Sequence, residues 1–279
     1  SMGDMGTMTL QKVNVANEFQ AESEGALTVK EETGTDGETV EAFTATDIYL
    51  TASRNLTVNG AITANDTADL LSHSGIITVN GTVLGGQVYI TTGVTKREEG
   101  SQVGKIVINK DVTANGEDGN VTITANVGDI TSSGVLTANQ KVSLNAVTSG
   151  NINVYNQIIG KDIEIQTANG NIETNATGTL TATRPDGKGG TITVGATEGN
   201  IVLGSAVTAD QKVDVEATAG SVTLNGAVES VAGEVEVAAN EAVTANATVK
   251  AKTDVTLSST AGNVTTGEKV TATSGTVSI

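Results

Sequence analysis

The chain has 279 residues, a formal net charge of −17 at pH 7, no cysteine, no tryptophan and only 2% aromatic residues. This charge argues against electrostatic binding to nucleic acid or an anionic membrane, and the lack of cysteine excludes disulfides and thiolate metal sites. No apolar stretch is long enough to cross a bilayer as a helix, so the sequence predicts neither a transmembrane helix nor insertion into a membrane.

The first part of the chain, residues 1–45, is the least regular and is rich in acidic residues. Leu27 and Ile48 are separated by the same interval that recurs later in the chain. We therefore expect residues 1–45 to form irregular first turns of the repeat in preference to a separate cap. Ser1 and Met2 resemble a cloning remnant, so we expect the chain to be a piece of a longer protein.

From residue 27 onward, short phrases place apolar residues at the first and third positions and a mostly polar residue between them. This alternation, with many β-branched residues, predicts short strands that bury one face. The phrases are 27–29, 48–50, 56–58, 88–90, 106–108, 121–123, 142–144, 163–165, 192–194, 213–215, 235–237 and 255–257.

A second phrase consists of glycine, a small polar residue, and Ile or Val. Its Ile or Val falls at positions 130, 152, 172, 201, 222 and 264, with spacings of 22, 20, 29, 21 and 42. A fixed period of about 21 residues indicates stacked structural units. Asn-Gly pairs between the strand phrases are expected at sharp corners, where these residues tolerate the left-handed conformation.

Two topologies are compatible with these phrases. Asn-Gly corners could join antiparallel hairpins, or the chain could coil so that each strand pairs in parallel with its copy one period later. The constant period favours the coil, because an extra residue within a strand would turn its side chains out of the core. We therefore predict an all-β parallel β-helix of about 21 residues per turn and roughly 12–13 turns. It forms a single rod over residues 1–279, with two or three strands in each turn.

Longer spacings point to surface loops. The longest single spacing, from 172 to 201, coincides with residues 183–190, which contain the only proline of the chain, and residues 92–100 are predicted to form a second loop. If the rod binds a partner directly, we expect the contact at these loops. The candidate residues are Lys96, Arg97, Glu98, Arg184, Asp186 and Lys188.

The tandem phrases at 199–217 and 220–227 resemble the repeats of filamentous-haemagglutinin-type large exoproteins, which are bacterial adhesins secreted by the two-partner route. The resemblance covers most of the chain from about residue 47 and is one of repeat style. It implies a right-handed parallel β-helix on the outside of a bacterium. The Asn-Pro-Asn-Gly motif that marks the secretion domain of that family is absent from this sequence.

Carboxylates at outward strand positions are the main candidates for chemistry. Alignment of the repeat places Lys212 beside Glu234 and Asp214 beside Glu236, one turn apart. The first pair is expected to attract, and the second to repel unless a cation bridges it. Paired carboxylates can cleave glycosides, but no aromatic residue lies nearby to stack a sugar. We therefore interpret these residues as structural and predict no catalytic residue.

The remaining candidates are isolated. His73 is the only histidine, so it cannot build a histidine metal site or a convincing catalytic triad. The acidic turns 35–38 and 115–120 offer oxygen ligands for calcium but match no calcium-binding loop, so solvated turns are preferred. Thr-x-Thr phrases do not recur on every turn, as ice binding would need. Three tyrosines in or beside strands could join a partner surface or give local cover: Tyr49, Tyr89 and Tyr155.

These observations predict a non-enzymatic stalk or adhesive segment of a large bacterial cell-surface or secreted exoprotein, without cofactor or metal. The alternative is an adhesin module that binds host or neighbouring-cell glycans or surface proteins through the two loops. A polysaccharide lyase or hydrolase and an ice-binding β-helix are weaker hypotheses. We expect a monomeric rod outside the cell, with no nucleic-acid partner and a C-terminal end that was cut from a longer rod.

Overall fold

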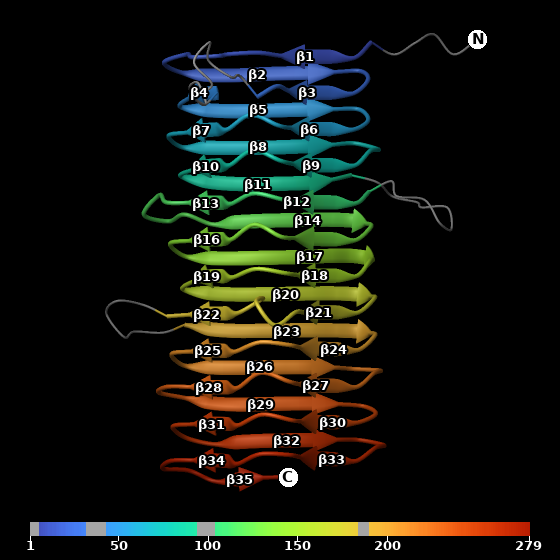
Figure 1. Ribbon diagram of the computed structural model, residues 1–279, viewed down its shortest axis with the longest axis vertical. Helices are drawn as coiled ribbons and strands as arrows, with labels where there is room; N and C mark the ends of the chain where they lie inside the picture. Colours follow the sequence, from blue (N-terminus) through green and yellow to red (C-terminus); the bar gives the residue numbers. More distant parts are fainter. Residues whose placement is uncertain (1–5, 32–42, 94–103, 184–189) are drawn as a thin grey trace, which may run out of the picture.

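The computed structural model describes residues 6–31, 43–93, 104–183 and 190–279. These residues form three parallel β-sheets and no helix, and successive turns stack along one axis (Figure 1). Strands pair with their counterparts one turn away and not with their neighbours in sequence. The prediction of a parallel β-helix with about 21 residues per turn and about 12 turns is therefore confirmed.

Sheet A contains twelve strands of three residues. They are β1 (Met8–Leu10), β3 (Leu27–Val29), β6 (Leu56–Val58), β9 (Ile77–Val79), β12 (Ile106–Ile108), β15 (Ile130–Ser132), β18 (Ile152–Val154), β21 (Ile172–Thr174), β24 (Ile201–Leu203), β27 (Val222–Leu224), β30 (Val243–Ala245) and β33 (Val264–Thr266).

Sheet B contains eleven strands, also of three residues. They are β4 (Phe43–Ala45), β7 (Ile62–Ala64), β10 (Val83–Gly85), β13 (Val112–Ala114), β16 (Leu136–Ala138), β19 (Ile158–Gly160), β22 (Leu180–Ala182), β25 (Val207–Ala209), β28 (Val228–Ser230), β31 (Val249–Ala251) and β34 (Val270–Ala272).

Sheet C contains twelve strands, most of them longer. They are β2 (Glu18–Ser23), β5 (Asp47–Ala52), β8 (Thr67–Ser72), β11 (Gln87–Thr92), β14 (Val121–Val127), β17 (Lys141–Ser149), β20 (Asp162–Asn169), β23 (Thr191–Glu198), β26 (Lys212–Ala217), β29 (Glu234–Ala239), β32 (Val255–Ser259) and β35 (Val277–Ser278).

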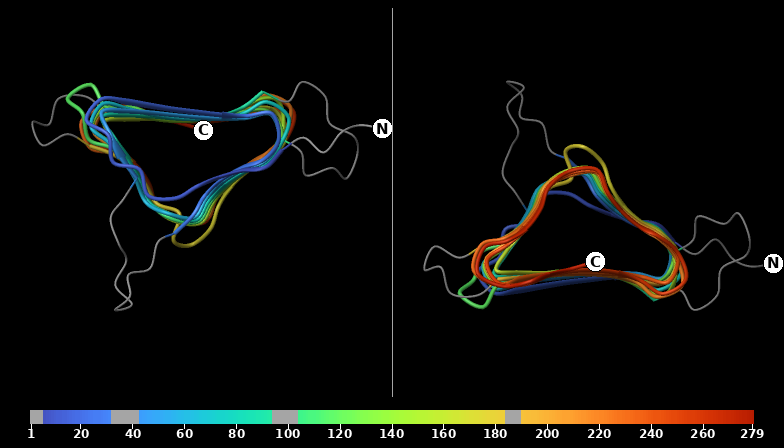
Figure 2. Two further views of the ribbon diagram at one scale, coloured as in Figure 1. Left: turned by 90° about the horizontal axis from the view of Figure 1, so that it is seen from above. Right: turned by 90° about the horizontal axis from the view of Figure 1, so that it is seen from below.

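The described residues form a triangular tube in cross-section, with sheet C as its long flat side and sheets A and B as the two shorter sides (Figure 2). The turns wind as a right-handed coil, the hand expected for parallel strands joined by crossovers (Figures 1 and 2). The sequence predicted two or three strands in each turn, and a complete turn has three, one in each sheet.

The core is a set of aliphatic ladders that run the length of the tube. In β26, for example, Val213, Val215 and Ala217 point inward and are fully buried, while the residues between them are partly or fully exposed. Parallel strands stack ~4.8 Å apart, so each inward methyl group packs on its counterpart one turn away. The one aromatic contact in the described core joins Phe19 and Phe43 edge to face, with ring centroids 4.9 Å apart.

The glycine of the repeated phrase forms the corner between sheets C and A. Gly128, Gly150 and Gly170 stack on one another and have φ angles of +146°, +149° and +154°. A Cβ added to Gly150 would collide with the carbonyl of Gly128, and one added to Gly170 would collide with the carbonyl of Gly150. Glycine is needed here for two reasons: the backbone angle suits no other residue, and adjacent turns approach too closely for a side chain.

The small polar residue of the same phrase satisfies a backbone donor of the next turn. Asn151 accepts a hydrogen bond on Oδ1 from the backbone N–H of Asn171 at 2.8 Å, and Asn171 accepts one from the N–H of Asn200 at 2.8 Å. Asp129 accepts the equivalent bond from Asn151 at 2.9 Å. Each such bond contributes about 1 kcal/mol, and the short Asn or Asp side chain has the reach that the corner requires.

The chain has five Asn-Gly pairs, and the prediction that these corners adopt the left-handed conformation is wrong for four of them: Asn59-Gly60, Asn80-Gly81, Asn115-Gly116 and Asn225-Gly226. Among the described residues, positive φ angles occur at Gly104, Gly128, Gly150, Gly170 and Gly199. Only Gly170 among these follows an asparagine. At Gly81 the constraint is contact, because an added Cβ would meet the carbonyl of Gly60 one turn earlier.

Asparagines, two of them from Asn-Gly pairs, form a ladder along the corner between sheets A and B. Asn80 donates from Nδ2 to Oδ1 of Asn59 at 2.8 Å, and Asn109 donates to Oδ1 of Asn80 at 2.7 Å. The amide is suited to this position because it both donates and accepts, so identical residues can bond to one another along the stack.

Extra residues lie at corners, as the sequence predicted. Ile172 pairs with Ile201 in sheet A although their separation in sequence exceeds the usual period, and most of the excess lies between β22 and β23. Ile77 pairs with Ile106 at the same long separation, with the excess between β11 and β12. The predicted loops at 183–190 and 92–100 lie there, although residues 184–189 and 94–103 are outside the described part of the chain.

The register of the first turns differs from the prediction. Leu27 belongs to sheet A and pairs with Leu56, whereas Ile48 belongs to sheet C and pairs with Phe19. The interval between Leu27 and Ile48 is therefore not a repeat, and that inference was wrong. The intervals between the residues that do pair, Leu27 with Leu56 and Phe19 with Ile48, are as long as the interval from Ile172 to Ile201. A third long connection therefore follows β3, and it was not predicted from the sequence.

Candidate functional site

The outer face of sheet C is the broadest surface of the rod, and it brings outward side chains from successive turns into register. Lys212 lies beside Glu234, Asp214 beside Glu236 and Glu216 beside Ala238 on strands β26 and β29. Neighbouring strands are ~4.8 Å apart, so side chains in one ladder are within reach of each other. Three groups of residues on this face have distinct chemistry.

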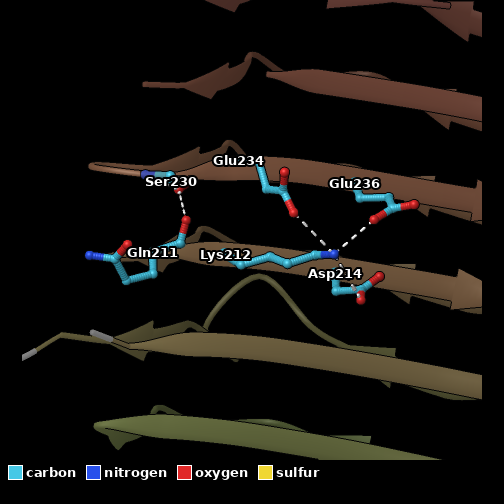
Figure 3. Close-up of polar contacts among 7 residues, drawn as sticks. Gln211, Lys212, Asp214, Ser230, Glu234 and Glu236 are labelled. Atoms are coloured by element: carbon cyan, nitrogen blue, oxygen red, sulfur yellow. Dashed lines mark hydrogen bonds and ion pairs between the residues drawn. The ribbon is translucent and has the colours of Figure 1, made fainter. Parts of the chain in front are cut away.

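The first group surrounds Lys212. Its Nζ lies 2.8 Å from Glu236 Oε2, 3.2 Å from Glu234 Oε1 and 3.4 Å from Asp214 Oδ2 (Figure 3). The register predicted for both residue pairs is confirmed. The expected repulsion between Asp214 and Glu236 is relieved because the lysine lies between the two carboxylates. Lys141 and Glu164 form an ion pair with the same diagonal geometry three turns earlier.

The carboxylates around Lys212 stabilise its charged form. The hydrogen bond to Glu236 is the main cause that raises the pKa of Lys212 above its usual range; partial burial acts in the opposite direction, and Glu234 and Asp214 raise the pKa further. Because the folded-state pKa is raised, this stabilisation is fully present below the ordinary lysine value of 10.5 and is lost only as the pH rises through the folded-state value.

Replacing Lys212 with methionine is expected to lower the free energy of unfolding by about 1 kcal/mol at pH 7 and low salt, because three adjacent carboxylates lose their shared cation. Urea denaturation at low and at high NaCl concentration measures this, and the loss should shrink at high salt. Lys252→Met is the matched control, since Lys252 is exposed and forms no ion pair within the described residues. Equal losses in the two variants would contradict the role assigned to the cluster.

The second group lies in the N-terminal half of the same face. Tyr49, Asp69 and Tyr89 occupy one outward ladder on β5, β8 and β11. Burial raises the pKa of the Asp69 carboxyl, and burial is also the largest cause of a raised pKa at Tyr49. The sequence placed both tyrosines outward but missed the carboxylate between them, because the three residues lie on successive turns and only the register unites them.

The third group surrounds a hollow of about 380 Å³ over β17, β20, β23 and β26. Gly195 lies in the outward ladder between Gln166 and Glu216, and Asn145 lies one turn further toward the N-terminus. The missing side chain of Gly195 leaves the gap. The sequence placed Glu216 outward as a strand carboxylate but did not indicate the other three residues. The available indication was a glycine directly after the strand phrase 192–194.

The residues predicted as partner-binding candidates cannot be placed. Lys96, Arg97, Glu98, Arg184, Asp186 and Lys188 lie outside the described residues, as does the acidic turn 35–38. The acidic turn 115–120 is described, and its backbone is engaged by amides: Gln140 Nε2 donates to Glu117 O at 2.9 Å and Gln87 Nε2 donates to Asp118 O at 2.6 Å.

His73 is exposed at the corner that follows β8, where its backbone N–H donates to the carbonyl of Ala52 at 2.9 Å. In the described part of the chain, no three acidic or histidine side chains gather closely enough to hold a metal ion. Over the same residues, no helix has the length and apolar character needed to cross a bilayer.

No protein-family model, no curated protein and no solved structure matches this chain. The resemblance of its repeats to those of filamentous-haemagglutinin-type exoproteins therefore remains a prediction that rests on the repeat phrases alone.

Proposed function

We propose that the chain is a non-enzymatic, rigid spacer with an adhesive role in a large bacterial cell-surface or secreted exoprotein. The observation that supports this most is the continuity of all three sheets from turn to turn, with one register shift between Ala125 and Val127 in sheet C. Main-chain hydrogen bonds in three sheets and one continuous core join the turns, so bending the rod would break several hydrogen bonds at once.

The chemistry of the outer face also supports a structural role. The carboxylates that could have formed an acid and base pair, Glu234 and Glu236, are both held by Lys212. Glycoside hydrolysis needs carboxyl groups that are free to reach the glycosidic bond. Because Lys212 holds these oxygens, the two glutamates are better suited to joining one turn of the rod to the next.

Outward threonines are not arranged for ice binding. Thr122 lies between Tyr89 and Ser143 in its ladder, and Thr193 lies between Glu164 and Asp214. Charged and bulky residues therefore interrupt the flat threonine array that an ice surface would need. The spacer hypothesis requires no such array.

Display of the chain on the surface of bacteria tests whether it acts as a rigid spacer. The chain is placed between a membrane anchor and a dye-labelled binding tip on bacteria, and the height of the tip is measured by energy transfer to an acceptor dye in the membrane. A rigid rod of twelve turns spans about 53 Å at ~4.8 Å per step. We expect one narrow height distribution, whereas a glycine–serine linker of 279 residues should give a broad one. Equally broad distributions for both proteins would overturn the proposal.

The alternative, direct binding of glycans or proteins through residues 92–100 and 183–190, is a separate proposal with a separate test. Deletion of residues 184–189 should then abolish adhesion of cells that display the chain, while the height of the tip stays unchanged. Both outcomes are measured on the same displayed protein.

A further inference from the structure

We propose that the hollow around Gly195 on the outer face of sheet C binds a neutral saccharide. The site lies on the broad face of the rod, and none of the described residues that line it belongs to the ion pairs around Lys212. It would give the spacer a weak sugar-binding activity of its own.

The fold does not require glycine at position 195. A Cβ built there would meet only Gln166 Cγ, at 3.9 Å, which is ordinary contact, and its φ angle is not among the positive ones. At Gly150, by contrast, both the backbone angle and the neighbouring turn exclude a side chain. Glycine inside a strand weakens it, and it often marks a place where a ligand approaches the backbone closely. Glycine at position 195 weakens the strand without being needed by the fold. We therefore ask which ligand could occupy the space that its missing side chain leaves open.

That opening has the size of a small ligand site. The hollow measures about 380 Å³, which is at the lower end of the range for ligand pockets and suits one or two sugar rings. Its floor is the backbone of β23 around Gly195 and Ala196. Asn145 and Gln166 border it on the N-terminal side, and Glu216 borders it on the C-terminal side.

Three polar side chains at the rim have no partner among the described residues. Asn145, Gln166 and Glu216 make no side-chain hydrogen bond or ion pair with any part of the chain that the structure describes. Asn145 and Gln166 are ladder neighbours and still do not bond to each other, unlike Asn59 and Asn80 at the corner. Two amides and a carboxylate are thus free around one hollow.

Their chemistry matches adjacent sugar hydroxyls. An amide both donates and accepts, and a carboxylate accepts on two oxygens, so together they can pair with hydroxyl groups that also donate and accept. Thr197 and Thr218 also line the hollow. Val147, which is 44% exposed, and Ala168 offer an apolar patch for the C–H face of a ring.

The negative charge of the hollow and of the whole chain favours a neutral ligand. No lysine or arginine lines the hollow, Glu216 contributes a negative charge, and the whole chain carries −17. Sialylated, sulfated or phosphorylated sugars would be repelled. Since the hollow is open to solvent, one site should bind with a Kd on the order of 1 mM. Several copies on one surface would be needed for firm attachment.

Fluorescent beads coated with the full chain test the proposal on an array of polymer-bound glucose, galactose, mannose, N-acetylglucosamine and N-acetylgalactosamine. Sialylated and sulfated conjugates serve as charged controls. We expect binding to at least one neutral conjugate and competition by the same free sugar at millimolar concentration. Gly195→Val should reduce bead binding at least tenfold because the valine fills the hollow, and Gln166→Ala should weaken it similarly.

A matched variant separates the site from general surface effects. Ala238→Val adds bulk in the same ladder, beyond Glu216 and outside the hollow, and should leave binding unchanged. Gly195→Val should melt at the same or a higher temperature than the parent, so its loss of binding would not come from unfolding. The proposal fails if no neutral conjugate binds, if only anionic ones do, or if Gly195→Val binds normally. Binding that survives Gly195→Val but disappears when residues 184–189 are deleted would assign the sugar to the loop.

Discussion

Replacing Gly150 with valine is expected to destabilise the rod by about 4 kcal/mol, a large fraction of the stability of an ordinary domain. The φ angle of +149° disfavours any side chain, which costs about 1–3 kcal/mol. In addition, the new Cβ would overlap the carbonyl of Gly128, so the two turns must move apart. This movement would strain the hydrogen bond from the Gly128 N–H to the carbonyl of Ser149, which joins the two turns and is 2.8 Å long.

Urea denaturation followed by circular dichroism measures this effect, and Gly195→Val is the control. The chemical change is the same, but Gly195 has space for a Cβ and no positive φ angle. Valine there should stabilise the protein by about 0.5–1 kcal/mol. If both variants lost the same stability, the close approach of turns at the Gly150 corner would not be what demands glycine.

Inserting one alanine between Val213 and Asp214 is expected to prevent the surrounding turns from folding. The insertion reverses the direction of every later side chain in β26. Asp214 would then occupy the inward position of Val215, and Glu216 that of Ala217, both of which are fully buried. Each buried, unpaired carboxylate costs several kcal/mol, so the two together are comparable to the whole stability of a domain.

The same insertion after Ala176 should cost no more than about 1 kcal/mol. This corner, between the end of β21 at Thr174 and the start of β22 at Leu180, is already longer than the corner from Val154 to Ile158 one turn earlier. Circular dichroism and limited proteolysis of the two insertion variants give the comparison. Equal tolerance at both sites would be incompatible with a coil whose strands are fixed by register.

Much of the fold could be predicted because the repeat is written in the sequence at a constant interval. The alternation at 213–215 predicted which side chains of β26 are inward, and the alignment of Lys212 with Glu234 predicted their register. The error at Leu27 and Ile48 shows the limit of this argument. Two residues can be one period apart although they belong to different sheets. The sequence alone does not distinguish this case from two residues on stacked strands of one sheet.

The groups on the outer face could be predicted only in part. The sequence brought Asp214 and Glu236 together, but the position of the Lys212 ammonium between them depends on side-chain torsions that the repeat does not specify. The hollow at Gly195 was missed for a related reason. A glycine that the backbone requires and one that it does not require look alike until a Cβ can be placed beside the neighbouring turn.

The sequence by itself determined the class of fold, the period of the coil and the inward face of each strand, because these follow from the spacing of apolar residues along the chain. The alignment of the repeat predicted two pairs of residues that meet across turns, but only the tertiary structure placed the lysine among three carboxylates, Asp69 between two tyrosines, and the amides around Gly195. These groups arise from stacking at ~4.8 Å, which brings together residues that are a full turn apart in the sequence.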